Sequence, residues 1–177
     1  PRAAPGRPCR RAVNDWHPCA AGGASVASNP CSEYMFRDDT ACNLASLNLM
    51  QFRRADKSFD IEAYEHAVRL WTVVLEISVL MAQFPSREIA QLSYDYRTLG
   101  LGYANIGGYL MSGGLAYDSA AGRAFCPALP AIMTGVCYAT SAALARASGA
   151  FARSRQHLAS PPRLTPNPRL APPGPPD

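Results

Sequence analysis

Metal-binding cysteine pairs are missing from this sequence. Its 177 residues include six cysteines, but no two of them form a Cys-x-x-Cys pair and none is spaced with a histidine as in a zinc finger. We therefore expect no metal site. A complete dinucleotide-binding fingerprint is missing too, because the segment 100–105 has the first two glycines of that motif and lacks the third. This argues against a Rossmann-type nucleotide site.

The sequence also has no secretory signal, and we find no apolar run long enough to span a membrane. We therefore expect a cytoplasmic protein without a membrane partner. Residues 14–152 hold nine Lys and Arg against twelve Asp and Glu, a net charge of −3, whereas the two ends together carry +7. The overall charge of +4 is thus a property of the ends. It gives no support for a nucleic-acid partner of the central region.

The two ends differ from the centre in composition as well. The first thirteen residues are rich in Arg, Ala and Pro, and residues 161–177 contain eight of the sixteen prolines without apolar periodicity. Such segments have little capacity to bury a core. We therefore predict a non-native or disordered segment over residues 1–13, one folded catalytic fragment over residues 14–152, and a Pro/Arg-rich disordered tail over residues 153–177.

The candidate reactive side chains of this sequence are concentrated in the stretch Asn29-Pro30-Cys31-Ser32-Glu33. In an extended segment, Asn29, Cys31 and Glu33 would project from one face, because side chains alternate along a strand. Pro30 has a fixed φ and biases Asn29 away from the helical region, which favours this extended arrangement. The alternative is a turn with a buried cysteine, since Asn-Pro often begins turns and free cysteines are commonly buried.

An extended arrangement would give one face an amide, a thiol and a carboxylate. A general base must lie within hydrogen-bond distance of the proton that it removes, about 2.6 to 3.2 Å. Glu33, two residues from the Cys31 thiol on the same face, could achieve that distance. Cys42 follows nine residues after Glu33, at the start of an apolar, strand-like run. We expect Cys42 to approach the same bound molecule from the opposite side.

Four motifs occur in this order along the chain: WHPC at 16–19, ASNPCSEYMF at 27–36, DTACNLASLNL at 39–49 and RTLGLGYAN at 97–105. Together they resemble the adenosylcobalamin-dependent (class II) ribonucleotide reductases, and the likeness runs from about Asn14 to Ala152. The resemblance implies an α/β fold, namely part of a ten-stranded α/β barrel. This chain would form a mainly α-helical portion of that barrel, with short strands and an extended finger loop.

The resemblance also implies a role for each residue of the loop. Cys31 would become a thiyl radical that takes the 3′ hydrogen of a ribonucleotide, and Glu33 would accept the proton of the 3′-hydroxyl. Asn29 would hydrogen-bond the sugar, and Cys42 would be one of the two cysteines that reduce the substrate. The loop residues expected to contact the substrate are Ser28, Asn29, Pro30 and Ser32.

The cofactor implied by the resemblance is adenosylcobalamin, whose radical would oxidise Cys31, and the implied reductant is a thioredoxin-type protein. Several parts of the family pattern have no counterpart in this sequence. They are the disulfide partner of Cys42, the phosphate-binding loop, the C-terminal cysteine pair and the nucleotide-sensing region. We therefore expect an internal piece of a longer polypeptide, which by itself neither reduces nucleotides nor binds cobalamin tightly.

Two other functions stay open at this point. The first is the catalytic subunit of a class I reductase, which uses the same loop but receives its radical from a separate metal-containing subunit. The second is an inactive remnant or interaction module, because a finger loop needs the surrounding barrel. Both a ribonucleoside diphosphate and a ribonucleoside triphosphate stay open as the substrate.

Apolar spacing predicts a helix that begins after Asp60 and ends near Phe84, before Pro85. From Leu70 onward the apolar face of this helix widens, which predicts burial on most sides. A short helix is expected after Ser86.

Two further helices are expected in the second half of the chain. One covers residues 99–111 and stops at the glycines 113–114. The other begins after Asp118, runs towards Ser148 and should be broken at Pro127 and Pro130, since an interior proline costs roughly 3 kcal/mol in a helix. The two cysteines in this region, at 126 and 137, are expected to be small buried side chains.

Overall fold

The computed structural model describes residues 13–14, 17 and 22–154. These residues divide into two compact units. The strand-helix unit contains Asn43–Ala82 and Thr98–Ala150. The loop unit contains the described residues up to Cys42, the segment Gln83–Arg97 and the described residues from Phe151 onward. Nearly all of the predicted segment 1–13 lies outside the described residues, and so does most of the predicted tail 153–177.

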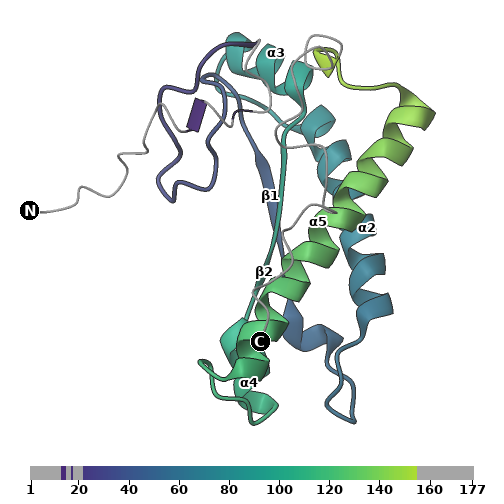
Figure 1. The fold of residues 1–177 in the computed structure, drawn as a ribbon. Coiled ribbons are helices and arrows are strands. Elements are labelled where there is room, and N and C mark those ends of the chain that lie inside the picture. Colours follow the sequence, from purple (N-terminus) through teal and green to yellow (C-terminus); the bar gives the residue numbers. More distant parts are fainter. Residues whose placement is uncertain (1–12, 15–16, 18–21, 155–177) are drawn as a thin grey trace, which may run out of the picture. The chain divides into compact units, whose positions relative to one another are not determined.

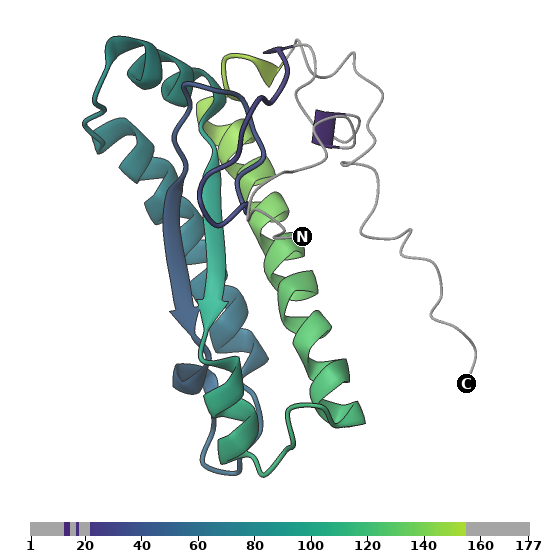
Figure 2. The ribbon, with the colours of Figure 1, turned by 90° about the vertical axis from the view of Figure 1, so that its left-hand side faces the viewer.

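Two parallel strands form the sheet of the strand-helix unit. Strand β1 (Asn43–Asn48) pairs with β2 (Leu99–Ala104), and the register places Asn43 opposite Leu99 and Asn48 opposite Ala104. The strand expected after Cys42 is therefore confirmed. Figures 1 and 2 show both strands running in the same direction, with the long helices α2 and α5 beside them.

The helix predicted over residues 99–111 is wrong in its first half, which forms β2. In this segment Leu99, Leu101 and Tyr103 alternate with two glycines, and each glycine costs about 1 kcal/mol in a helix. Pairing with β1 instead satisfies the backbone of this segment. The second half is helix α4 (Ile106–Ser112), and it stops at the glycines 113–114 as predicted.

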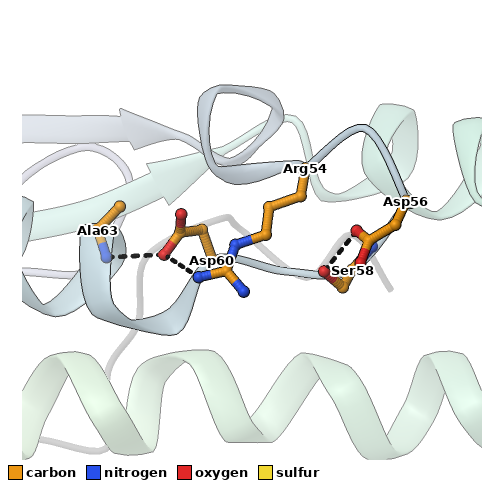
Figure 3. A network of polar contacts seen from close by, with 5 residues as sticks. All are labelled: Arg54, Asp56, Ser58, Asp60 and Ala63. Carbon is orange, nitrogen blue, oxygen red and sulfur yellow. Dashed lines mark hydrogen bonds and ion pairs between the residues drawn. The ribbon is translucent and has the colours of Figure 1, made fainter.

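Helix α2 (Ile61–Met81) follows β1 and the short 3₁₀ helix η2 (Leu49–Phe52). Asp60 is its N-cap as predicted, but the helix ends three residues before Phe84. Figure 3 shows the polar contacts at this start. The Asp60 carboxylate accepts hydrogen bonds from the Ala63 backbone N–H and from the Arg54 guanidinium, each at 3.0 Å. Asp56 makes a similar local contact, because its carboxylate accepts from the Ser58 hydroxyl at 2.7 Å.

Asp60→Ala is expected to destabilise the chain at neutral pH and much less in acid. The hydrogen bond from Arg54, and then that from the Ala63 backbone, hold the pKa of the Asp60 carboxyl below its usual value. The stabilisation is present above the unfolded pKa of about 3.9 and is lost as the pH falls through the lower folded pKa. Thermal unfolding at pH 7 and pH 3 measures the difference. Asp60→Asn keeps a cap acceptor, so its Tm at pH 7 should lie between those of the native chain and Asp60→Ala. Equal Tm differences between the native chain and Asp60→Ala at both pH values would contradict the prediction.

The inner face of α2 packs into the core through Tyr64, Val68 and Leu75. The predicted burial on most sides is wrong, because the opposite face is open: Leu70, Ile77 and others remain about half exposed. The described residues supply packing on the β1, β2 and α5 side of the helix and not on this face. The wide apolar surface is therefore a real feature of the sequence, and residues 13–14, 17 and 22–154 do not cover it.

Helix α5 (Ala120–Ser148) runs without interruption through Pro127 and Pro130, so the predicted break is wrong. Both prolines are exposed, and at a spacing of three they share one face of the helix. The neighbouring face holds Leu129 and Met133, which are buried in the core. Water can hydrogen-bond the carbonyls that the prolines leave unpaired, while core packing keeps the helix continuous.

Length and composition alone would also let α5 cross a membrane, a property that the sequence analysis missed. A single helix of this kind is weak evidence for a membrane span, because core helices of soluble proteins meet the same two criteria. In this structure α5 packs along α2 (Figure 1).

The core of the strand-helix unit combines aliphatic and aromatic side chains. Tyr64 is fully buried, and its ring meets Phe52 and Phe59 edge to face at 5.2 and 5.3 Å between ring centroids. The Tyr109 ring stacks on Phe125 of α5 at 5.0 Å. These contacts join η2, α2, α4 and α5 into one cluster.

Candidate functional site

The segment that leads into β1 carries the predicted site residues. Residues 23–42 contain no helix or strand (Figure 2). The backbone N–H of Ser32 donates to the Asn29 carbonyl at 3.0 Å, and Ser32 has a positive φ of 63°. The predicted extended conformation of residues 29–33 is therefore wrong. Pro30, with its fixed φ, occupies the second position of a turn, which is the alternative that the Asn-Pro pair indicated.

The turn displays its thiol instead of burying it. Cys31 is exposed and Glu33 is exposed, while Asn29 is half-buried. Ser28 stabilises the turn, because its hydroxyl donates to the Asn29 carbonyl at 3.0 Å and lies 3.3 Å from the Ser32 hydroxyl. The buried-cysteine part of the turn alternative therefore does not hold, and the sulfur is open to a reactant.

The side chain of Asn29 has a structural task within the loop. Its Oδ1 accepts a hydrogen bond from the Tyr34 backbone N–H at 2.9 Å. Among the described residues we find no partner for its Nδ2 group. The carboxamide is therefore held by its oxygen, and its N–H donors remain available to an acceptor such as a sugar hydroxyl.

Cys42 differs from Cys31 in its surroundings. It is partly buried, and the Ala41 backbone N–H beside it donates to the Ser93 hydroxyl at 2.9 Å. Burial, and after it the negative charge of Glu33, raise the pKa of the Cys42 thiol to about 11. Glu33 and Cys42 therefore lie close enough to interact, and Cys42 is a protonated thiol at neutral pH.

Replacing Glu33 by Gln is expected to speed the alkylation of Cys42, because removal of the carboxylate charge lowers the pKa of the thiol and only the thiolate reacts. In the native chain the rate should rise about tenfold per pH unit between pH 8 and 10. Iodoacetamide labelling, read for each cysteine by peptide mass spectrometry, measures both effects. Glu62→Gln, an exposed carboxylate in α2, is the control. Equal Cys42 rates in the native chain and in Glu33→Gln would contradict the prediction.

The two remaining described cysteines belong to the packing of α5. Cys126 and Cys137 are partly buried free thiols, and the Thr72 hydroxyl lies 3.4 Å from the Cys137 sulfur. Burial raises the pKa of Cys137. No cluster of three metal-ligating side chains occurs among residues 13–14, 17 and 22–154. The contact with Thr72 agrees with the interpretation of Cys137 as a packed side chain, and both cysteines are partly rather than fully buried.

A shallow pocket lies beside the turn. It has a volume of about 220 Å³ and is lined by Ala27, Ser28, Asn29, Tyr34, Phe36, Arg37, Asp38, Asp39 and Thr40. Pockets for drug-sized ligands measure roughly 300 to 1,000 Å³. A corrinoid is larger than such ligands, so the described residues do not by themselves enclose a cobalamin. The lining includes Ser28 and Asn29 of the predicted site but not Cys31, Glu33 or Cys42.

Sequence reasoning missed Tyr34, Arg37 and Thr40 as components of the site. Tyr34 and Thr40 are six residues apart in an irregular segment, so no helical or strand periodicity links them. The available signal was their position inside the motifs at 27–36 and 39–49. These motifs extend beyond the reactive residues on both sides.

Comparison with known proteins places these motifs in a family. A family model described as the barrel domain of ribonucleotide reductase matches residues 2–161. The vitamin B12-dependent ribonucleotide reductase of Agrobacterium fabrum is 68% identical over 150 residues, which cover 84% of this chain and 12% of that protein. The same enzyme of Bradyrhizobium diazoefficiens is 61% identical over 170 residues, covering 96% and 14%. That of Rhodopirellula baltica is 51% identical over 139 residues, covering 78% and 13%.

The chain thus spans 12–14% of the length of these relatives. The match confirms the predicted fold class, and the two parallel strands with their flanking helices are part of the α/β barrel. The boundaries at residues 13 and 152 remain predictions. Because the matched segment includes the Asn29–Glu33 turn, Cys42 and both strands, the chain belongs to the ribonucleotide reductase barrel domain family.

Proposed function

We propose that this chain is a section of the catalytic barrel of an enzyme that reduces ribonucleotides to deoxyribonucleotides. Cys31 carries the radical and exchanges a hydrogen atom with the 3′ carbon of the ribose. Glu33 accepts the proton of the 3′-hydroxyl, and the Asn29 amide hydrogen-bonds the sugar. Cys42 is one of the two thiols that reduce the substrate. Ser28, Pro30 and Ser32 shape the turn against which the sugar binds.

The observation that carries this proposal is an exposed thiol on the turn, followed eleven residues later in the same loop by a partly buried thiol that is affected by Glu33. Cys31 is exposed on the turn, where a substrate can reach it, and Cys42 is partly buried and interacts with Glu33. A thiol whose pKa is about 11 keeps its proton at neutral pH. This protonated state suits the proposed role of Cys42 as a donor of hydrogen and electrons, since only a thiolate would act as a nucleophile.

The radical source that we propose is adenosylcobalamin, because the relatives are named as vitamin B12-dependent. It would supply the radical that oxidises the thiol, and the pocket described above leaves its binding to other parts of a complete reductase. A thioredoxin-type protein is the proposed reductant. We place the protein in the cytoplasm, without a nucleic-acid or membrane partner.

A chimera tests the proposal with the residues of this chain. The matching 150-residue segment of the Agrobacterium fabrum relative is replaced by the corresponding segment of this chain, and ribonucleotide reduction is measured with and without adenosylcobalamin. We expect cobalamin-dependent turnover by the chimera and none by the isolated chain. A chimera that folds but has no activity would contradict the proposal, and activity without cobalamin would favour the class I alternative.

A further inference from the structure

The side chains of Tyr34 and Thr40 form a hydrogen bond with each other next to the turn. The Tyr34 hydroxyl lies 2.8 Å from the Thr40 hydroxyl, and the Thr40 hydroxyl donates to the Arg37 carbonyl. A threonine hydroxyl has one hydrogen to donate. Because that hydrogen is used on Arg37, Tyr34 is the donor and Thr40 the acceptor of their shared hydrogen bond.

The same tyrosine holds Asn29 through its backbone. The Tyr34 N–H donates to Oδ1 of Asn29 at 2.9 Å, so the orientation of the Asn29 carboxamide depends on where the Tyr34 backbone lies. The Tyr34 ring also packs on Phe36, with 5.8 Å between ring centroids. The Tyr34 side chain is thus held at two places, by Phe36 at its ring and by Thr40 at its hydroxyl. Both contacts restrain the Tyr34 backbone.

We infer that Tyr34 and Thr40 are positioning residues that orient the Asn29 carboxamide for the substrate sugar. This inference rests on the function proposed above. Asn29, Tyr34 and Thr40 all line one pocket beside the turn, so the two hydrogen-bonded side chains lie next to the carboxamide that they orient. Neither Tyr34 nor Thr40 needs to react, because their effect passes through the Tyr34 N–H to Asn29.

The test is a double-mutant cycle in the chimera. Thr40→Val removes the acceptor of the Tyr34 hydroxyl and should lower kcat/KM about three- to tenfold, mainly through KM, which is the range for one lost hydrogen bond. Tyr34→Phe removes the same bond from the other side and should give the same loss. Thr40→Ser keeps the hydroxyl and should restore kcat/KM to within about twofold. In an Asn29→Ala background, Thr40→Val should have no further effect.

Thr140→Val is the matched control, because the Thr140 hydroxyl also donates to a backbone carbonyl, that of Val136 at 2.7 Å, but in helix α5. It should leave kcat/KM unchanged. Equal losses from Thr40→Val with and without Asn29, or failure of Thr40→Ser to restore activity, would overturn the inference.

A second measurement does not depend on turnover. In the native chain, hydrogen exchange of the Tyr34 amide should be several-fold faster in Thr40→Val than in Thr40→Ser, since the bond to Asn29 opens more often. Unchanged exchange would overturn the inference even where the chimera is active. Faster exchange in an inactive chimera would support the positioning role while contradicting the proposed reaction.

Discussion

Cys31→Ser is expected to abolish ribonucleotide reduction by the chimera, with a loss of at least about 10³-fold in kcat, as is usual when the group that forms the reactive intermediate is removed. A serine hydroxyl fills nearly the same space, but its O–H bond is too strong to be converted to a radical under the same conditions. The turn should survive, because the Cys31 side chain is exposed and contributes none of the hydrogen bonds that define it. Deoxyribonucleotide formation by chromatography is the measurement.

Cys126→Ser provides the control for this experiment. Cys126 is a partly buried free thiol in α5 and has no part in the proposed chemistry. Its substitution should leave turnover within about twofold of the parent, since both thiol and hydroxyl are small side chains. Activity retained by Cys31→Ser, or lost equally in both variants, would contradict the assignment of the radical to Cys31.

Tyr64→Ala is expected to destabilise the chain by about 3 to 5 kcal/mol, the range for removing a large aromatic side chain from a core. Tyr64 is fully buried, and its ring contacts Phe52 and Phe59. Burial raises the pKa of its hydroxyl to about 12, in agreement with a site closed to water. Urea unfolding of the full chain, followed by circular dichroism, measures the change in unfolding free energy.

Tyr64→Phe separates the ring from the hydroxyl. The hydroxyl donates to the Leu129 carbonyl at 3.4 Å, a long hydrogen bond, so its removal should cost about 1 kcal/mol or less. A small effect of Tyr64→Ala, or equal effects of the two substitutions, would show that this aromatic cluster does not hold the strand-helix unit together.

Local signals in the sequence were sufficient for the starts of two helices. Asp60 and Ser86 both act as N-caps, because their side chains accept hydrogen bonds from backbone N–H groups three residues later. Such contacts are short-range and are encoded within a few residues. For this reason the starts of α2 and α3 (Arg87–Tyr96) were predicted correctly.

Features that depend on distant contacts were predicted less well. The segment Leu99–Ala104 forms a strand because β1 pairs with it across more than fifty residues of sequence. The two prolines of α5 are tolerated because the face that they occupy is exposed, which only the packed structure reveals. Periodicity alone contains neither the pairing partner of a strand nor the side of a helix that meets solvent.

The candidate site divides in the same way. The residue types at Asn29, Cys31 and Glu33 indicated the chemistry, but the backbone shape between them depends on a hydrogen bond that closes the turn at Ser32. The hydroxyl pair of Tyr34 and Thr40 has no sequence signature, because it joins two positions of an irregular loop. Chemistry was therefore easier to predict from this sequence than geometry.

The prolines of α5 also define its mechanics. Pro127 and Pro130 cannot donate to the carbonyls of Arg123 and Cys126, so two successive turns lack a rung of the hydrogen-bond ladder. A helix bends more easily where backbone hydrogen bonds are missing. Helix α5 therefore consists of a short and a long rigid segment joined at a flexible joint. Thermal fluctuations, and any force transmitted along the helix, should concentrate at that joint.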